Sequence, residues 1–573
     1  MSTTSHTFPS SPVEKLDRRM FLEGTCQIAI GAAASLVGSA WGRRSIQAGT
    51  ASPESVSAVV ETANGKVRGA VVDGIQIFKG LAYGASTSGP NRFMPPRKPD
   101  SWTGVRDAFE FGPIAPQRDP KLPAAAREAS IYGSGKPMSI FAYPPQVPES
   151  EDCLVLDLYT PGLIDGRRRP VMVWLHGGGF AQGSASAPVY DGTNLARRGD
   201  VVVVGVNHRL NVLGYAYLGE LGGSDFAKSG NVGILDLVQA LEWVRDNIER
   251  FGGDPHNVTI FGESGGGSKV CTLLAMPCAK GLFHRAAIES GPGIRSMDRQ
   301  QATKLAEGLL TELDLKPSQV RELQKLPLDR IMAANFATGG GIAMGMGRRG
   351  FAPVVDGDSL PRHPFSPDAP LISADVPILI GYNRTEAEFF LLSDPGAKNM
   401  TDDDLKRRVT TLFSDKGQRV IDLYRKADPG LTPYELFVLI QTDSGMGVNS
   451  IRIAERKSAA GRAPAYLYNF NWDTPVEGLK SPHTLEIPFV FNNIKIAKPL
   501  TGDGQDAFEL ANKVTDAWVA FARTGNPNAP GLPNWPAYNN QDRATMVIDN
   551  QSKILLDPIR EKRVLLMELG RPA

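Results

Sequence analysis

A serine flanked by glycines is the first feature of this chain that could carry out chemistry. Ser264 lies in the run Gly262-Glu263-Ser264-Gly265-Gly266, directly after the apolar residues 258–261. Glycine on both sides lets the backbone turn sharply from a strand into a helix and keeps the hydroxyl clear of other side chains. A helix up to Met276 would point its free N–H groups at developing negative charge. Ser264 is therefore a candidate nucleophile. The alternative for these glycines, a phosphate-binding loop, would need lysine at the position where Ser268 stands.

A second glycine-rich run could supply the hydrogen-bond donors that such a nucleophile requires. It reads Trp174-Leu175-His176-Gly177-Gly178-Gly179-Phe180 and follows an apolar stretch. Three successive glycines leave backbone N–H groups unshielded and permit the backbone angles that point two of them inward. A glycine-rich turn without a catalytic role is the alternative. The position of this glycine-rich run upstream of Ser264 favours an oxyanion hole.

The general base can be sought among few histidines. The chain has seven, which are His6, His176, His208, His256, His284, His363 and His483. Where a nucleophilic serine follows a strand in this way, the order along the chain is serine, acid, histidine. His284 follows Ser264 too soon to leave room for a strand that carries the acid. His363 is possible, but His483 lies in a loop between two apolar runs, where this order places the base, and elimination favours it.

The acid that orients the histidine should lie between Ser264 and His483, just beyond the end of a strand. Glu386 follows the apolar residues 377–380 by a short loop. Glu388 and Asp356 are alternatives, and the residues alone do not separate the three.

The elements that must position these residues follow from short apolar runs. Runs rich in β-branched residues predict buried parallel strands at 171–175, 201–206, 258–261, 377–380 and 465–470. A helix between the second and third of these is indicated by Ile234, Leu237, Leu241, Val244 and Ile248 on one face. Another helix runs from Ala507 to Phe521 and ends at Gly525. Strand, helix, strand predicts an α/β fold with a large, mostly parallel sheet covered by helices.

Together these motifs resemble the type-B carboxylesterases, the group that includes cholinesterases and bacterial para-nitrobenzyl esterases. The resemblance extends from about residue 60 to 547. Further motifs that carry it are Phe78-Lys79-Gly80-Leu81-Ala82-Tyr83, Glu151-Asp152-Cys153-Leu154, Asn207-His208-Arg209, Phe251-Gly252-Gly253-Asp254-Pro255 and Gly525-Asn526-Pro527. It implies an α/β-hydrolase fold with helical and loop insertions over the active site.

The resemblance also assigns roles to residues. The family's acid lies in a segment like Gly381-Tyr382-Asn383-Arg384-Thr385-Glu386, which selects Glu386, and its histidine lies in a segment similar to the one that begins at His483. Its oxyanion donors correspond to the backbone N–H groups of Gly178, Gly179 and Gly265. Two further residues are expected beside the triad, Ser290, which often supports the acid in that family, and Glu263.

Two departures from the family pattern have structural consequences. Gly265 stands where the family usually has alanine, so we expect a looser turn after the nucleophile. The cysteine that usually pairs with Cys153 is replaced in Ala115-Pro116-Gln117. The family's disulfide is therefore expected to be absent.

These residues predict a serine carboxylic-ester hydrolase that acts through an acyl-enzyme on a small-molecule ester. Hydrolysis of an amide, carbamate or thioester by the same triad is one alternative, and a non-catalytic, cholinesterase-like binding module is another. No metal or cofactor is expected. The residues do not indicate the native substrate or the oligomeric state.

The composition excludes some partners. The 573 residues include 62 Lys and Arg against 61 Asp and Glu, a net charge of +1. This balance provides no basic surface for nucleic acid or for an anionic membrane. We expect neither partner, and no insertion into a membrane once the signal described next is removed.

The N-terminus resembles an export signal. Asp17-Arg18-Arg19-Met20-Phe21-Leu22 is similar to the twin-arginine pattern, and the apolar residues 28–37 that follow are too few to span a membrane. Cleavage after Ala40 or Ala48 would suit a signal peptidase. We predict that residues 1–48 are removed and that the protein is periplasmic or extracellular. The alternatives for this segment are a disordered tail or an apolar helix of the folded domain.

Residues 49–573 are predicted to form a single domain with insertions near 118–148, 295–350 and 387–460. The run from Gly339 to Gly350 contains six glycines. Loops of this length are uncommon in a compact domain unless they cover a site. A lid and a plain surface elaboration are both compatible with the pattern.

Overall fold

The structure is a computed structural model, and it describes residues 55–123, 132–133, 135–339, 350–394 and 396–570. The described residues all belong to one compact unit that begins at residue 51. The expected signal segment and residues 340–349 of the glycine-rich run lie outside the described residues.

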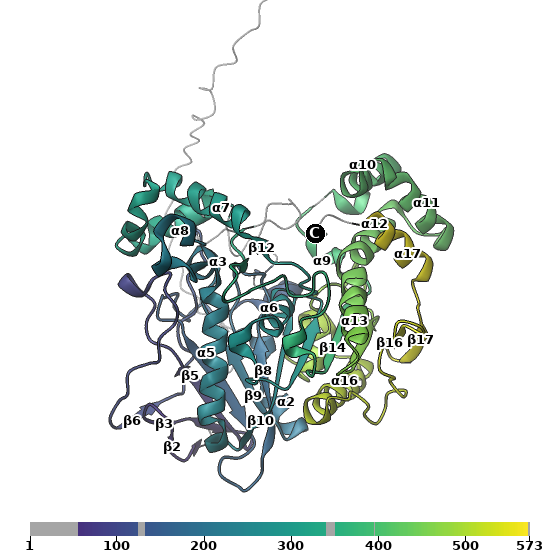
Figure 1. Ribbon diagram of the computed structural model, residues 1–573. Coiled ribbons are helices and arrows are strands. Elements are labelled where there is room, and N and C mark those ends of the chain that lie inside the picture. The colour runs from purple at the N-terminus through teal and green to yellow at the C-terminus, as the bar shows by residue number, and fades with distance from the viewer. Residues whose placement is uncertain (1–54, 124–131, 134, 340–349, 395, 571–573) are drawn as a thin grey trace, which may run out of the picture. The chain divides into compact units, whose positions relative to one another are not determined.

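A large sheet forms the centre of the described chain (Figure 1). From one edge to the other its strands are β1 (Ser55–Val56), β4 (Ala70–Val72), β5 (Ile75–Ala82), β7 (Val155–Thr160), β9 (Val202–Val206), β8 (Arg169–Leu175), β10 (Gly253–Glu263), β11 (Arg285–Glu289), β14 (Ile378–Asn383), β15 (Ala465–Phe470), β16 (Ala544–Ile548) and β17 (Lys553–Leu556). The strands from β9 to β16 in this order pair in parallel, and the pairs outside them are antiparallel. The prediction of a large, mostly parallel sheet is confirmed.

Two small sheets accompany it. One contains β2 (Val60–Glu61), β3 (Lys66–Arg68) and β6 (Val105–Asp107), and the other contains β12 (Met297–Asp298) and β13 (Val354–Val355).

Helices surround the sheet. They are α2 (Thr193–Gly199), α3 (Asn211–Tyr215), α4 (Gly219–Gly222), α5 (Val232–Asn247), α6 (Gly265–Leu274), α7 (Arg299–Glu312), α8 (Leu328–Ala337), α9 (Ala387–Leu391), α10 (Asp402–Phe413), α11 (Gly417–Ala427), α12 (Pro433–Thr442), α13 (Val448–Ala460), α14 (Ile487–Val490), α15 (Lys498–Thr501), α16 (Gln505–Thr524) and α17 (Arg560–Leu569). Within the described ranges, none of these helices combines the length and the apolar character that crossing a membrane requires.

The two faces of the sheet bury different helices because side chains alternate along each strand. On β8, Val173 packs in one core with α5, whereas Trp174 points to the other face and packs in a core with α16. Figure 1 shows α5 and α16 on opposite sides of the central strands. The end of α16 is confirmed, since Gly525 caps it with a left-handed φ of +80°.

The predicted strands differ from the observed ones mainly at their ends. β10 begins at Gly253 rather than at residue 258, with a register irregularity between Gly253 and Val258. β14 continues to Asn383, three residues beyond its predicted end, because Tyr382 and Asn383 pair with β15. This extension carries Asn383 into the site described below.

The proposed insertions are largely helical where the structure describes them. Residues 295–339 include α7 and α8, and 387–460 include α9 to α13. In Figure 1, α7 and α8 appear at the upper left and α10 and α11 at the upper right. The described part of 118–148 contains only a short 3-10 turn at Pro137–Phe141. A lid formed by Gly339–Gly350 stays a prediction.

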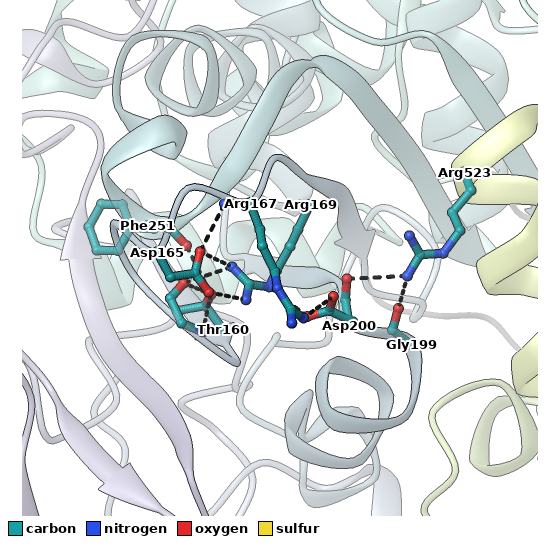
Figure 2. A network of polar contacts seen from close by, with 9 residues as sticks. Thr160, Asp165, Arg167, Arg169, Gly199, Asp200, Phe251 and Arg523 are labelled. Atoms are coloured by element: carbon teal, nitrogen blue, oxygen red, sulfur yellow. Dashed lines mark hydrogen bonds and ion pairs between the residues drawn. The ribbon is translucent and has the colours of Figure 1, made fainter.

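At the amino end of β8, a buried arginine ties three segments together (Figure 2). Arg169 is 4% exposed and pairs with Asp200 through Nε at 2.7 Å and with Asp165 through Nη2 at 2.5 Å. Arg523 of α16 donates to the carbonyl oxygen of Gly199 at the end of α2. This network lies at the end of β8 opposite to its carboxyl end.

Candidate active site

The carboxyl ends of neighbouring parallel strands bring the predicted site residues to one edge of the sheet. The register pairs Leu175 of β8 with Gly262 of β10, and Glu263 with Glu289 of β11. The glycine run, Ser264 and Ser290 therefore begin beside one another. The loops after β14 and β15, which carry Glu386 and His483, start at the same edge. Ligand sites in open α/β sheets form at such an edge.

Ser264 occupies a sharp turn between β10 and α6. Its backbone angles, φ 57° and ψ −121°, are unusual for a residue other than glycine, and its N–H donates to the carbonyl oxygen of Glu289 at 2.9 Å. A Cβ at Gly262 would lie 2.5 Å from the carbonyl oxygen of Leu175, so a side chain has no room there. Ser264 remains partly exposed although its neighbours on both sides are buried. This is the strained strand-to-helix turn that the sequence predicts.

The absence of a side chain at Gly265 has a different consequence from the expected one. A Cβ there would lie 2.2 Å from the carbonyl oxygen of Gly179. The backbone of the glycine loop therefore occupies the space that an alanine methyl group would need. The expectation of a looser turn is wrong, because the loop and the first turn of α6 are in backbone contact.

The glycine loop presents backbone donors next to Ser264. Gly178 and Gly179 have φ values of +85° and +63°, in the left-handed region that favours glycine. Ala181 and Gln182 donate to the carbonyl oxygen of Gly178 at 3.3 and 3.1 Å. Within the described residues, the N–H groups of Gly178, Gly179 and Gly265 have no hydrogen-bond acceptor. They are therefore available to an oxyanion.

His483 and Glu386 form a buried pair. Nδ1 of His483 lies 2.5 Å from Oε2 of Glu386, and both side chains are about 1% exposed. The other oxygen of Glu386 accepts the N–H of Asn383 at 2.7 Å. The rings of Phe389 and Phe390 lie 5.5 and 4.9 Å from the imidazole ring. The acid thus fixes the orientation of the imidazole and selects the tautomer with its proton on Nδ1.

The second nitrogen of His483 faces Glu263 instead of the serine. Nε2 lies 3.1 Å from Oε1 of Glu263. Among the described residues, the hydroxyl of Ser264 makes no hydrogen bond. Burial, together with the charges on Glu486, Glu386 and Glu289, raises the pKa of Glu263 well above its usual range. Neither Nε2 of His483 nor Oε1 of Glu263 has a hydrogen-bond partner among the described residues, so Nε2 lies close to the carboxyl group of Glu263 without a hydrogen bond to it.

Glu263 belongs to a cluster of buried acids, with Glu289, Glu386 and Glu486, each at most 1% exposed. Glu486 accepts hydrogen bonds from Oγ of Ser290 at 3.0 Å and from Nδ2 of Asn383 at 2.6 Å. Burial and the negative charge of Glu386 raise the pKa of Glu486. Burial and Glu486 raise the pKa of Glu289 to about 8.

Ser290 therefore has a different partner from the one expected. It donates to Glu486 and not to Glu386, and Asn383 hydrogen-bonds to both carboxyl groups. The sequence reasoning missed Glu486 and Glu289. Each of these two acids lies inside an apolar segment of the sequence, where an unpaired charge would be costly to bury. This pattern could have identified them as buried polar residues of the site.

The alternative residues are engaged elsewhere. Glu388 accepts hydrogen bonds from the Thr385 hydroxyl and the Lys480 N–H, both at 2.8 Å. Asp356 accepts from the side chain of Asn231 at 2.9 Å, and Nε2 of His363 lies 3.4 Å from Asp298. None of the three touches His483. In the part of the chain that the structure describes, no group of His, Cys, Asp and Glu side chains is arranged to hold a metal ion.

Comparison with known proteins gives one consistent result. The model of the carboxylesterase family matches residues 56–565. The para-nitrobenzyl esterase of Bacillus subtilis (strain 168) is 34% identical over 510 residues, which cover 88% of this chain and 97% of the relative. The phenmedipham hydrolase of Pseudarthrobacter oxydans is 32% identical over 526 residues, 89% of this chain and 99% of that protein.

A solved structure agrees with these relatives. The crystal structure of a carboxylesterase from Geobacillus stearothermophilus is similar with a TM-score of 0.76 and 37% sequence identity, covering 88% of this chain and 99% of that one. The α/β-hydrolase fold described above agrees with this likeness. The chain belongs to the carboxylesterase family and is a carboxylic ester hydrolase.

Proposed function

We propose that this protein hydrolyses small-molecule esters through an acyl-enzyme formed on Ser264. The observation that carries the proposal is the buried contact of 2.5 Å between His483 and Glu386, at the sheet edge where Ser264 follows β10. Such a pair prepares an imidazole to accept a proton from a nearby hydroxyl. Ser264 is partly exposed, so a substrate can reach its hydroxyl.

The chemistry then follows in two halves. Oγ of Ser264 attacks the ester carbonyl carbon while Nε2 of His483 takes the hydroxyl proton, and the carbonyl oxygen gains the negative charge. N–H groups of the glycine loop and of Gly265 stabilise that charge. The tetrahedral intermediate collapses, the ester C–O bond breaks, and the alcohol leaves with the proton from His483. Water, deprotonated by His483, then releases the acid and restores Ser264.

This scheme requires a change at the base. Nε2 of His483 must exchange its contact with Glu263 for one with Ser264. Catalytic hydrogen bonds are often long or misaligned in a free enzyme and tighten only when substrate binds. We infer that substrate binding brings this exchange about, since Nε2 has no hydrogen-bond partner among the described residues that would hold it at Glu263.

The direct test replaces Ser264 with alanine. Ser264→Ala should lower kcat by about 10⁴- to 10⁶-fold and abolish labelling by a fluorophosphonate probe. Ser268→Ala is the matched control, because Ser268 is also partly exposed and lies in the first turn of α6, which follows Ser264. It should keep both activity and labelling. Near wild-type turnover in Ser264→Ala would overturn the assignment.

Para-nitrobenzyl esters are suitable first substrates, because the Bacillus subtilis relative is named for them. A panel that adds short and long acyl esters, aryl esters, amides, carbamates and thioesters would define the bond that is cleaved best. Fold and triad alone do not separate these bonds. The highest kcat/KM in the panel should belong to an ester.

We also propose that residues 1–48 direct export through the twin-arginine route. The support is the paired Arg18 and Arg19 before a short apolar run, together with a family match that begins only at residue 56. Replacing both arginines with lysine should retain the protein in the cytoplasm of a bacterial host. Unchanged export of this double variant would refute the proposal.

A further inference from the structure

Lys269 is a buried amine beside the glycine loop to which the mechanism above gives no role. It lies on α6, five positions after Ser264, and is 0% exposed. Its Nζ donates to the carbonyl oxygen of His176 at 2.9 Å. That carbonyl belongs to the peptide that joins His176 to Gly177, the first residue of the loop. In the part of the chain described by the structure, Lys269 has no ion pair with an acid.

The surroundings of Lys269 make this hydrogen bond important. The imidazole rings of His176 and His208 stack beside it, with centroids 4.8 Å apart, and the ring of Phe180 lies 6.0 Å from Nζ. Burial and the charge of Lys269 lower the pKa of both histidines well below the usual range. Burial lowers the pKa of Lys269 itself to about 7. An amine in such a place is costly to bury unless its N–H groups are satisfied.

The contact between α6 and the loop has few other means of fixation. A Cβ at Gly266 would lie 1.9 Å from the carbonyl oxygen of Leu175, and one at Gly265 would lie 2.2 Å from that of Gly179. The first turn of α6 therefore lies backbone to backbone against residues 175–179, without interlocking side chains. Lys269, on the next turn, supplies a directional contact across this surface.

The far end of the loop is held separately. The N–H of Gly183 donates to Oε1 of Gln117 at 2.8 Å, and the N–H of Asn211 donates to the carbonyl oxygen of Phe180 at 2.6 Å. Between these anchors and His176 stand the three glycines, which are the most flexible residues of a chain. The N–H groups of Ala181 and Gln182 hold the carbonyl oxygen of Gly178 inside the loop, and a fixed peptide at the start of the loop further limits where the glycine N–H groups point.

We propose that Lys269 is a positioning residue that fixes the start of the glycine loop against α6 and so keeps the N–H groups of Gly178 and Gly179 directed at the oxyanion. The inference rests on the proposed function of these two glycines. Lys269 touches no substrate atom and acts only through the His176 carbonyl.

Kinetics of Lys269→Met test the proposal, because methionine keeps an unbranched apolar stem and removes the donor. We expect kcat to fall by about 10- to 100-fold with KM changed less than about 2-fold, a smaller loss than removal of an oxyanion donor itself causes. Lys457→Met is the matched control. Lys457 of α13 is also buried and donates to backbone, to the carbonyl oxygens of Ser373 and Ala374 at 3.0 and 2.7 Å. It should keep wild-type kcat.

A second measurement separates positioning from a general loss of stability. Ser264 adds to the carbonyl carbon of a trifluoromethyl ketone and forms a tetrahedral oxyanion. The affinity of the enzyme for this ketone should therefore weaken in Lys269→Met by the same factor as kcat/KM. The affinity for para-nitrobenzyl alcohol, a product without an oxyanion, should stay unchanged. Lys269→Gln, whose donor is one bond shorter, should give intermediate values for both kcat and ketone affinity.

The outcomes distinguish the two proposals. Wild-type kcat and ketone affinity in Lys269→Met, or equal losses in Lys457→Met, would overturn the role of Lys269 while Ser264→Ala stays inactive. An active Ser264→Ala would instead overturn the proposed function. If Lys269→Met yields no folded protein, Lys269→Gln is compared in its place, and wild-type kcat in that variant overturns the inference.

Discussion

Replacing Glu289 with glutamine should change how the stability of this protein depends on pH. The carboxyl group of Glu289 is fully buried, and Oε1 accepts the indole N–H of Trp518 at 2.7 Å. Its other oxygen has no hydrogen-bond partner among the described residues. Burial and the charge of Glu486 raise its pKa from an ordinary value of 4.5 to about 8. The folded protein therefore holds a proton at Glu289 at a pH where the unfolded chain has lost it.

The sign and size of the effect follow from linkage. Between pH 4.5 and about 8 the folded state binds one proton more than the unfolded state, so the free energy of unfolding falls as pH rises. The stabilising contribution is complete below pH 4.5 and is lost as pH rises through the folded pKa. Each pH unit costs about 1.4 kcal/mol, so Glu289 accounts for up to about 4 kcal/mol between pH 5 and 8.

Glu289→Gln keeps an acceptor for Trp518 and removes the titration. An unfolding entropy of about 2 cal/mol/K per residue gives about 1 kcal/mol per degree for a chain of this size, so 4 kcal/mol corresponds to roughly 4 °C. Thermal unfolding followed by circular dichroism at pH 5, 6, 7 and 8 is the assay. The Tm of the variant should rise relative to wild type by about this amount from pH 5 to pH 8.

The exposed Glu307 of α7 provides the control. Glu307→Gln should follow the wild-type Tm at every pH. A difference between Glu289→Gln and wild type that stays constant from pH 5 to pH 8 would refute the reasoning, because it would mean that Glu289 titrates alike in both states.

Two further substitutions test other contacts. Gly265→Ala places a Cβ 2.2 Å from the carbonyl oxygen of Gly179, so the loop must move by about 1 Å. Steady-state kinetics should then show kcat lowered about 10²-fold with little change in KM. Unchanged kcat would contradict the observed backbone contact. Arg169→Met removes the partner of two half-exposed aspartates, Asp165 and Asp200, and should lower Tm at pH 7. Arg169 lowers the pKa of both carboxyl groups, so their stabilising contribution is lost as pH falls. The Tm difference should therefore narrow from pH 4 toward 2, and a constant difference would argue against these ion pairs.

The strands and the turn at Ser264 could be predicted because their signals are local. β15 has its predicted bounds, and Ser264 sits in the predicted turn between β10 and α6. An apolar run must be buried wherever it occurs, and glycine is required where the backbone turns so sharply. Neither conclusion depends on which distant segment packs nearby.

The partner of His483 could not be derived in this way. Glu386, Glu388 and Asp356 all follow strands, and only the resemblance to a family separated them. The structure places Glu386 against the imidazole and engages the other two elsewhere. The choice depends on how far β14 pairs with β15, which is a long-range property of the sheet.

The sequence by itself therefore determined the class of fold, the turn that carries Ser264 and the glycine loop, since periodicity and glycine spacing act over a few residues. Tertiary structure alone decided the contacts of buried polar groups. It placed Glu486 between Ser290 and Asn383, directed Lys269 at the His176 carbonyl, and filled the space beside Gly265 with the backbone of Gly179. These outcomes depend on burial and on close approach between segments far apart in the chain, and residue spacing contains no information about either.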